Sequence, residues 1–223
     1  MTRSLVVLSG GQDSTICLAW ALRLFDRVEA LSFDYGQRHR VELESAGAIA
    51  KATSVPHIVV PVPGLTGSSL TDHSAPVLPS GGLLNLPSTF TPGRNAVFLA
   101  LAAGRAAASG IHDLVTGICQ TDFSGYPDCR DDFRASMEAT MRLALGGFPL
   151  RIHAPLMHLT KAESVALAAR LDALPLLALS HTCYLGRRPA CGECPACVLR
   201  LRGFQEAGIE DPIPYSHNES RPA

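Results

Sequence analysis

Short apolar runs alternate along the chain with longer segments in which apolar residues recur at helical spacing. The runs span 5–8, 28–33, 57–60, 114–117 and 150–153. The helical patterns span 14–25, 41–53, 95–109, 129–145 and 161–170. Continuous apolar runs predict strands buried on both faces, and strands that alternate with helices predict a parallel sheet. We therefore expect an α/β fold with a five-stranded parallel sheet and helices on both faces.

One edge of this sheet is the expected place for a ligand. In open parallel sheets with right-handed crossovers, the crevice lies at the carboxyl ends of the strands. The segments that follow the apolar runs should therefore form the site. At the start of the last helical pattern, Thr160 followed by Glu163 predicts a capping box.

The segment 61–92 interrupts this alternation. It is rich in proline, glycine and serine and shows no sustained periodicity. A loop of this length inside a compact domain is often a lid or a binding loop, and we expect it over the mouth of the site. We expect residues 1–175, including this loop, to form the main domain, and residues 176–223 to form a small C-terminal helical module and tail.

Composition and charge favour small-molecule chemistry. The chain has 223 residues, of which 47% are hydrophobic, and a formal net charge of -1. This balance argues against bulk attraction to nucleic acid or to an anionic membrane. The N-terminal apolar run is too short for a signal peptide, and no run approaches the length of a membrane span. We expect a cytoplasmic protein without membrane or direct nucleic-acid partners.

A glycine-rich turn lies between the first strand and the first helix. It belongs to a segment of eleven residues, namely Leu8, Ser9, Gly10, Gly11, Gln12, Asp13, Ser14, Thr15, Ile16, Cys17 and Leu18. Glycines without a Cβ let the backbone approach a ligand, and amide groups at a helix N-terminus bind anions. The segment matches neither the Walker A pattern nor the dinucleotide-binding pattern. The sequence therefore predicts another kind of nucleotide phosphate site, and the alternative is a helix cap with Asp13 as a first-turn acid.

Four cysteines near the C-terminus have the spacing of metal ligands. Cys183, Cys191, Cys194 and Cys197 form C-x7-C-x2-C-x2-C. Four thiolates hold Zn²⁺ tetrahedrally, and a closed site of four cysteines is usually structural. We expect one structural Zn²⁺, with an iron–sulfur cluster or unliganded thiols as the alternatives.

The turn with the sequence SGGQDS resembles the PP-loop of the N-type ATP pyrophosphatases. Members of that family commonly cleave ATP between its α and β phosphates and adenylate an oxygen of the substrate. The resemblance implies that the loop holds the departing pyrophosphate and that Asp13 helps to hold Mg²⁺.

Further stretches, at 33–39, 92–95, 122–130, 183–197 and 211–215, make the resemblance more specific. With the SGGQDS turn they resemble the family of 7-cyano-7-deazaguanine synthases of queuosine precursor biosynthesis, from residue 5 to about residue 215. The resemblance implies that 7-carboxy-7-deazaguanine, ammonia and ATP give 7-cyano-7-deazaguanine through an adenylated acid and an amide. It also implies a homodimer.

The same resemblance implies roles for individual side chains. Arg94 and Lys161 are candidates to neutralise the charge on the phosphates. Six residues are candidates to read the ring and its carboxylate, with Asp122 and Asp128 also counted among the catalytic candidates: Arg38, His39, Asp122, Tyr126, Asp128 and Arg130. A carboxylate suits the N–H edge of the deazaguanine and an arginine suits the acid. The alternatives are a solvated helix start at 38–39 and an ordinary loop at 122–130.

Two other functions compete with this interpretation. One is a different PP-loop ligase, such as a tRNA-modifying thiolase, which a basic surface and a reactive thiol beside the loop would favour. The other is a zinc-ribbon interaction module on a degenerate nucleotide-binding fold. The near-zero net charge weighs against the first and the intact SGGQDS turn against the second.

Overall fold

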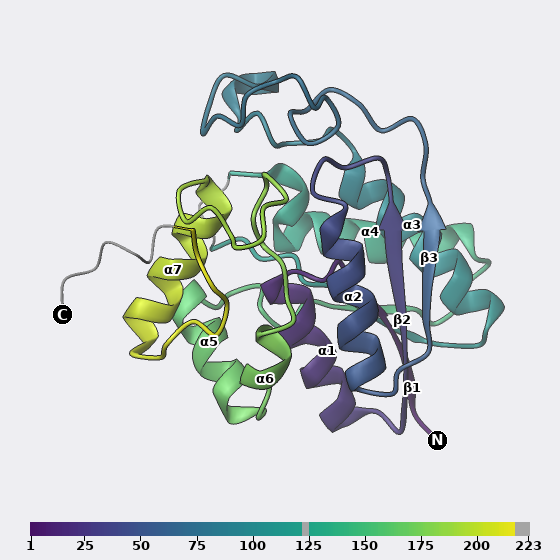
Figure 1. Ribbon diagram of the computed structural model, residues 1–223. Coiled ribbons are helices and arrows are strands. Elements are labelled where there is room, and N and C mark those ends of the chain that lie inside the picture. Colours follow the sequence, from purple (N-terminus) through teal and green to yellow (C-terminus); the bar gives the residue numbers. More distant parts are fainter. Residues whose placement is uncertain (122–124, 217–223) are drawn as a thin grey trace.

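Parallel strands form the centre of the molecule in the computed structural model, which describes residues 1–121 and 125–216 (Figure 1). In these residues one sheet has the order β3-β2-β1-β4-β5, with every neighbouring pair parallel. The strands are β1 (Arg3–Val7), β2 (Arg27–Asp34), β3 (His57–Pro61), β4 (Asp113–Val115) and β5 (Arg151–His153). The predicted five-stranded parallel sheet is thus confirmed.

The predicted helices also form, with their ends shifted by a few residues. They are α1 (Gln12–Leu24), α2 (Val41–Ala52), α3 (Arg94–Ala108), α4 (Asp131–Ala144) and α5 (Lys161–Arg170). Short 3-10 turns occur at η1 (Leu83–Asn85) and η2 (Pro127–Cys129), and two further helices follow, α6 (Leu174–Leu177) and α7 (Pro195–Ala207). The sequence predicts a helical C-terminal module but not the bounds of these two helices. The first is a single turn, and the ligand spacing of the cysteines obscured the helical pattern of the second.

Helices cover both faces of the sheet because successive strand residues point to opposite sides. On β1, Val6 packs in the core cluster that holds α1, α2 and α5, whereas Leu5 packs in the cluster that holds α3. Both side chains are almost fully buried. The result is a three-layer α/β arrangement, in which every helix that follows a strand begins near the carboxyl edge of the sheet (Figure 1).

The start of α5 has the predicted capping box. The Glu163 amide donates to Thr160 Oγ1 (3.2 Å), and the Thr160 amide donates to a Glu163 carboxylate oxygen (2.7 Å). These bonds satisfy backbone donors of the first turn, which would otherwise lack partners. The cap therefore fixes the position of Lys161, the first residue of α5.

The segment 61–92 runs beyond the carboxyl ends of β2 and β3 (Figure 1). Pairs of hydroxyl groups hold its two ends together, with Ser68 Oγ 2.7 Å from Thr91 Oγ1 and Ser69 Oγ 2.9 Å from Ser88 Oγ. Arg38 adds hydrogen bonds to the carbonyls of Ser69 (3.1 Å) and Ala75 (2.9 Å). The segment is thus anchored to the start of α2.

The C-terminal part contributes to two cores. A small cluster contains the four cysteines and Tyr215, whereas Leu177 and Phe204 pack in the main core beside α1 and α5. The predicted domain boundary after residue 175 stays a prediction. Among the described residues, no helix has both the length and the apolar character that a bilayer crossing requires.

Candidate active site

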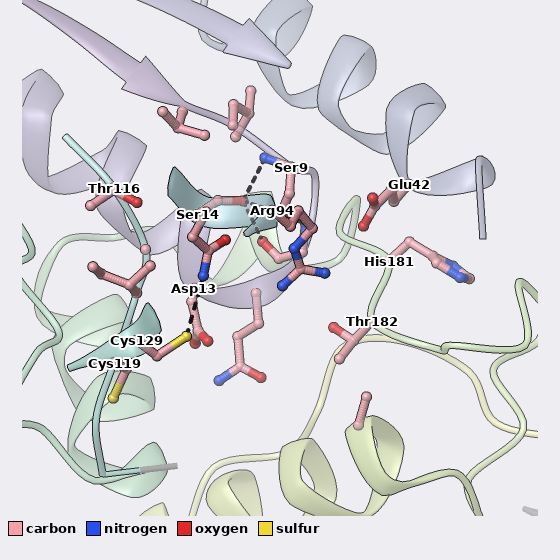
Figure 2. A pocket seen from close by; sticks show the side chains of 18 of the residues that line it. Ser9, Asp13, Ser14, Glu42, Arg94, Thr116, Cys119, Cys129, His181 and Thr182 are labelled. Atoms are coloured by element: carbon pink, nitrogen blue, oxygen red, sulfur yellow. Dashed lines mark hydrogen bonds between the residues drawn. The ribbon is translucent and has the colours of Figure 1, made fainter. Parts of the chain in front are cut away.

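A cavity of about 290 Å³ lies at the carboxyl edge of the sheet. Its lining comes from the segments that follow β1, β2 and β4, from the starts of α2, α3 and α5, and from 181–184 and α7. Figure 2 shows side chains from these separate segments pointing toward a shared space. The cavity therefore lies where the predicted sheet places a ligand.

One wall is the glycine loop, which we define as residues 8–14. The Ser9 amide donates to Ser14 Oγ (3.2 Å), and the Gly11 amide donates to Ser9 Oγ (3.2 Å). Gly10 has φ +90°, and a Cβ there would lie 2.1 Å from the Glu42 carbonyl oxygen, so the position requires glycine. Helix α1 begins after Gly11 without a side-chain cap. Its first amides can therefore bind an anion in the cavity.

Asp13 and Lys161 meet on this side of the cavity. Lys161 Nζ lies 2.9 Å from each carboxylate oxygen of Asp13. Helix α7 approaches this pair so closely that a Cβ on Gly203 would lie 2.3 Å from Lys161 Cγ. The glycine thus makes room for the lysine. The pair offers an anionic and a cationic group beside the glycine loop.

A second wall, which we call the facing wall, consists of Tyr35, Glu42, Arg94, Tyr126 and Tyr184 and joins four separate segments of the chain. Arg94 Nη1 donates to the Tyr35 hydroxyl (3.4 Å), and its guanidinium carbon lies 5.9 Å from the centre of the Tyr35 ring. The Tyr126 hydroxyl is hydrogen-bonded to Thr89, which ties the wall to the segment 61–92.

Burial controls the protonation of the phenols in the facing wall. It raises the pKa of Tyr35 to about 12 and also raises the pKa of Tyr126 and Tyr184. These phenols are therefore neutral at ordinary pH and can donate hydrogen bonds. The facing wall is an aromatic, hydrogen-bonding surface around one guanidinium, which suits a planar heterocycle that carries an acid group.

Many residues singled out from the sequence line the cavity. They are Leu8, Ser9, Gly11, Gln12, Asp13, Ser14, His39, Arg94, Tyr126 and Lys161. Five others from the proposed nucleotide segment lie outside the lining. Gly10 contacts α2, and Ile16, Cys17 and Leu18 are fully buried in the main core. Thr15 is buried too, and its hydroxyl donates to the Gly11 carbonyl (2.7 Å).

Three candidates for substrate binding also lie outside the lining. Arg38 binds carbonyls of the segment 61–92, and Arg130 is exposed before α4. Asp128 is buried against the start of α3, where it accepts a long hydrogen bond from the Asn95 amide (3.4 Å), and burial raises its pKa. Asp122 lies outside the described residues. The segment 61–92 supplies no lining residue among those described.

Several lining residues were not among the sequence candidates. They include Glu42, Tyr35, Phe98, His181, Thr182 and Tyr184. Tyr35 and Glu42 follow β2 closely, so their place at the carboxyl edge was a usable signal. His181 and Thr182 reach the cavity because the His181 amide donates to the Gly10 carbonyl (2.8 Å). No local pattern indicates that contact.

The four predicted metal ligands converge. The Sγ atoms of Cys183, Cys191, Cys194 and Cys197 all lie within 4.8 Å of one another, and all four residues are buried. Sulfur atoms around a tetrahedral Zn²⁺ with bonds of about 2.3 Å would be about 3.8 Å apart. Cys191 Sγ and Cys197 Sγ lie at 3.8 Å. The cluster can therefore hold a metal ion with no open position.

A buried arginine connects this cluster to the cavity. Arg200 forms two hydrogen bonds of 2.8 Å with the Asp211 carboxylate, which also accepts the Tyr215 hydroxyl (2.6 Å). The same guanidinium donates to Ser180 Oγ (2.7 Å) and Thr182 Oγ1 (3.1 Å). These bonds satisfy a charge that would be costly to bury alone, and they fix the segment that enters the cavity.

Comparisons with known proteins identify the family of this chain. A family model described as queuosine biosynthesis protein QueC matches residues 3–208. The 7-cyano-7-deazaguanine synthase of Laribacter hongkongensis is 53% identical over 215 residues, covering 94% of this chain and 93% of that protein. The protein of the same name from Chromobacterium violaceum is 51% identical over 219 residues, covering 95% and 92%.

Solved structures show weaker likenesses. The U34-tRNA thiolase NcsA from Methanococcus maripaludis with its [4Fe-4S] cluster is 15% identical, covers 92% of this chain and 67% of that one, and has a TM-score of 0.47. A 4-thiouridine synthetase in a complex with RNA and bound ATP is also 15% identical, covers 93% and 50%, and has a TM-score of 0.47. Nothing about the chemistry of this chain follows from likenesses of this strength.

Proposed function

Because the chain belongs to the QueC family of queuosine biosynthesis proteins, we infer that it is an ATP-dependent ligase that forms 7-cyano-7-deazaguanine. The match of the family model to residues 3–208 carries this inference. We propose 7-carboxy-7-deazaguanine and ammonia as the other substrates. The cavity supports the proposal because it combines an anion-binding loop with an aromatic wall around a guanidinium.

A carboxylate is a poor electrophile, so it must be activated before nitrogen can replace its oxygens. Transfer of AMP to the acid releases pyrophosphate, and ammonia then displaces AMP to give an amide. A second adenylation, on the amide oxygen, followed by loss of AMP and a proton, gives the nitrile. Since the same carbon reacts twice, one cavity can serve both rounds.

The glycine loop is proposed to hold the phosphates of ATP. The amides at the start of α1 and the hydroxyls of Ser9 and Ser14 are the donors that face the cavity. Lys161 and Arg94 would stabilise the negative charge that grows as pyrophosphate leaves. Asp13, an oxygen ligand at the cavity wall, would hold Mg²⁺, which neutralises phosphate charge when bound.

The facing wall is proposed to bind the deazaguanine. Tyr35, Tyr126 and Tyr184 offer ring faces and neutral hydroxyls, and Arg94 offers a cation to the acid group. Among the earlier candidates, His39 and Tyr126 line the cavity. Arg38 and Asp128 would act from behind that wall, through the segments they hold, and Arg130 stays a candidate from the sequence alone. Asp122 stays a candidate from the sequence alone.

The cysteine cluster is proposed to hold one structural Zn²⁺. Four buried thiols within 4.8 Å of one another fit a closed tetrahedral site, and the ion would fix the turn that carries 181–184 into the cavity. Metal analysis of the purified protein should give one zinc per chain, and Cys194→Ser should lower that content. Iron with visible absorbance in place of zinc would contradict this assignment.

Further proposals concern the setting of the reaction. We propose a homodimer in the cytoplasm that uses free ammonia and binds no nucleic acid directly. The formal net charge of -1 supports the last point. Light scattering coupled to size-exclusion chromatography measures the assembly state, and a monomer would contradict the dimer.

A turnover assay tests the proposed function. The protein is incubated with ATP, Mg²⁺, ammonium and 7-carboxy-7-deazaguanine, and the base and nucleotide products are followed by mass spectrometry. The amide should appear first and the nitrile second, together with AMP and pyrophosphate. Failure of folded protein with its metal bound to form either product would contradict the function.

A further inference from the structure

Two carboxylates belong to the described lining of the cavity, Asp13 and Glu42. They differ in their partners. Both oxygens of Asp13 are engaged by Lys161 at 2.9 Å. Glu42 has a side chain only 12% exposed, and its neighbours are the neutral amide of Gln37 and the imidazole of His39. Glu42 is therefore a nearly buried carboxylate that pairs with no lysine or arginine among the residues that the structure describes.

Contacts on both sides hold the Glu42 carboxylate in place. Gln37 Nε2 donates to Glu42 Oε1 (3.1 Å), and Gln37 is itself fully buried and accepts the Tyr35 amide (2.9 Å) at its side-chain oxygen. The second carboxylate oxygen, Oε2, lies 3.4 Å from His39 Nε2. Figure 2 shows the Glu42 side chain entering the cavity from α2, with the Arg94 guanidinium toward the centre.

The His39 ring provides a second, independent observation. His39 is 5% exposed and lines the cavity, and its Nδ1 has no hydrogen-bond partner among residues 1–121 and 125–216. A buried nitrogen without a partner is costly unless something fills the position when the protein works. Glu42 and His39 thus form a contacting pair. The Glu42 carboxylate lies at the cavity, and the Nδ1 atom of His39, on the other side of the ring, has no partner among the described residues.

Among the described residues, the lysine and arginines that line the cavity have partners other than Glu42. Lys161 pairs with Asp13, Arg200 pairs with Asp211, and Arg94 donates to Tyr35. A carboxylate with so little exposure is stabilised by a positive charge at contact distance. A small cation that enters the cavity would supply that charge, and the aromatic rings of the facing wall would add a cation–π attraction.

We propose that Glu42 is the ammonium site and the general base of the reaction, positioned by His39 and Gln37. This inference rests on the proposed function. Ammonium bound at Glu42 gives up a proton to the carboxylate, and the nitrogen lone pair attacks the carbonyl carbon of the acyl adenylate. The C–O bond to AMP breaks, and a second N–H proton is lost as the amide forms. Acyl adenylate and ammonium thus give amide, AMP and two protons.

The same base serves the second round. Adenylation of the amide oxygen removes one N–H proton, and the remaining N–H proton leaves as the C–O bond to AMP breaks and the nitrile forms. Each proton comes from the nitrogen that Glu42 first received as ammonium. A single carboxylate beside that nitrogen can therefore accept the protons of both rounds and pass them toward His39 or solvent.

A nucleophile that needs no deprotonation distinguishes a general-base role of Glu42 from a role in substrate binding or folding. Hydroxylamine is unprotonated at neutral pH and needs no base before it attacks, whereas ammonia is mostly ammonium. In Glu42→Gln, which keeps an oxygen that can accept from Gln37, ammonium-dependent amide formation should fall about 100-fold. Hydroxamate formation with hydroxylamine and ATP–pyrophosphate exchange with the acid should stay within about threefold of the wild type.

Two further variants complete the test. Glu44→Gln removes a carboxylate from the same first turn of α2 whose side chain is 71% exposed, and it should change none of the three rates. His39→Gln removes the positioning imidazole and should lower the ammonium rate by about tenfold while sparing hydroxamate formation.

The outcomes distinguish the two inferences. If the wild type forms neither amide nor hydroxamate, the proposed function itself fails. If the wild type forms both and Glu42→Gln keeps its ammonium rate, the role of Glu42 alone is overturned. Equal loss of both products in Glu42→Gln also overturns it, because the residue would then act in activation of the acid or in folding.

Discussion

The glycine loop and the facing wall enclose one cavity but draw on the chain very differently. The glycine loop is seven consecutive residues whose shape follows from the glycines, the serines and the start of α1. The facing wall takes Tyr35, Glu42, Arg94, Tyr126 and Tyr184 from four separate segments. A short sequence motif is enough to specify the glycine loop, whereas the residues of the facing wall come together only when the protein folds.

Because of this difference, we expect the two walls to bind different substrates. A loop of backbone amides and hydroxyls can bind the phosphates of ATP, whatever acid is activated. A wall built from scattered aromatic and charged side chains can be matched to one acid. We therefore expect substitutions in the glycine loop to abolish activation altogether, and substitutions in the facing wall to act on the acid and the nitrogen steps.

The largest effect should come from Asp13→Asn. It removes the proposed Mg²⁺ ligand and leaves Lys161 without the carboxylate that it binds at 2.9 Å. ATP–pyrophosphate exchange should fall on the order of 1000-fold. Asp172→Asn, at a side chain 85% exposed, is the matched control and should leave exchange unchanged. Near-normal exchange in Asp13→Asn would contradict a role for Asp13 and the glycine loop in activation of the acid.

Arg94→Gln tests the facing wall. It removes the guanidinium that lies 5.9 Å from the Tyr35 ring, and exchange that depends on the acid should fall about 100-fold. Binding of ATP alone, followed by calorimetry, should change little, because Arg94 would bind the acid group and meet the growing phosphate charge only as pyrophosphate leaves. Arg105→Gln, at an exposed position of the same helix, is the control. Loss of ATP binding in Arg94→Gln would instead assign this residue to the phosphates.

Gly203→Ala tests how α7 positions Lys161. The added Cβ would lie 2.3 Å from Lys161 Cγ, so the lysine must move away from Asp13. We expect about a tenfold loss of kcat and a loss of about 1 to 3 kcal/mol in the free energy of unfolding. Chemical denaturation and steady-state kinetics measure the two effects.

Gly104→Ala is the matched control for Gly203→Ala. Gly104 also lies within a helix, α3, and a Cβ there meets nothing within 4 Å. This change should stabilise the protein by about 0.5 to 1 kcal/mol, because alanine favours a helix more than glycine does. If both variants behave alike, close packing at Gly203 does not position the lysine.

The smallest effect should follow from Arg38→Ala. The change removes hydrogen bonds of 2.9 to 3.1 Å to carbonyls of the segment 61–92 and loosens the tie between that segment and α2. KM for the acid should rise by about threefold with little change in kcat, since only the order of the wall is lost. Limited proteolysis within 61–92 should become faster.

Arg40→Ala is the control, since Arg40 pairs with Asp34 and its side chain is 67% exposed. If proteolysis of Arg38→Ala matches that of Arg40→Ala, the guanidinium of Arg38 does not anchor the segment.

The parts of the fold that could be predicted from the sequence are those with a local cause. Apolar runs and helical spacing predicted the sheet and five helices, and Thr160 with Glu163 predicted the cap of α5. The cysteine spacing predicted the cluster because turns between closely spaced ligands bring them together. In each case the interacting residues lie close together in the chain.

Contacts between distant segments could not be predicted in the same way. Gly203 and Gly117 give no local signal, but a Cβ would lie 2.3 Å from Lys161 Cγ at the first and 3.0 Å from the Ser14 amide nitrogen at the second. Arg38 and Asp128 are polar residues beside the expected site, yet they hold the segment 61–92 and the start of α3. Their partners depend on tertiary packing.

An oxygen-labelling experiment tests the central claim, that both carboxylate oxygens leave through adenylates formed in this cavity. The acid is labelled with ¹⁸O in both carboxylate positions, and the products of complete turnover are weighed by mass spectrometry. Two AMP molecules should form for each nitrile, each carrying one ¹⁸O, with unlabelled pyrophosphate. Unlabelled AMP, or label in inorganic phosphate, would contradict the account, because the acid would then be activated by another route.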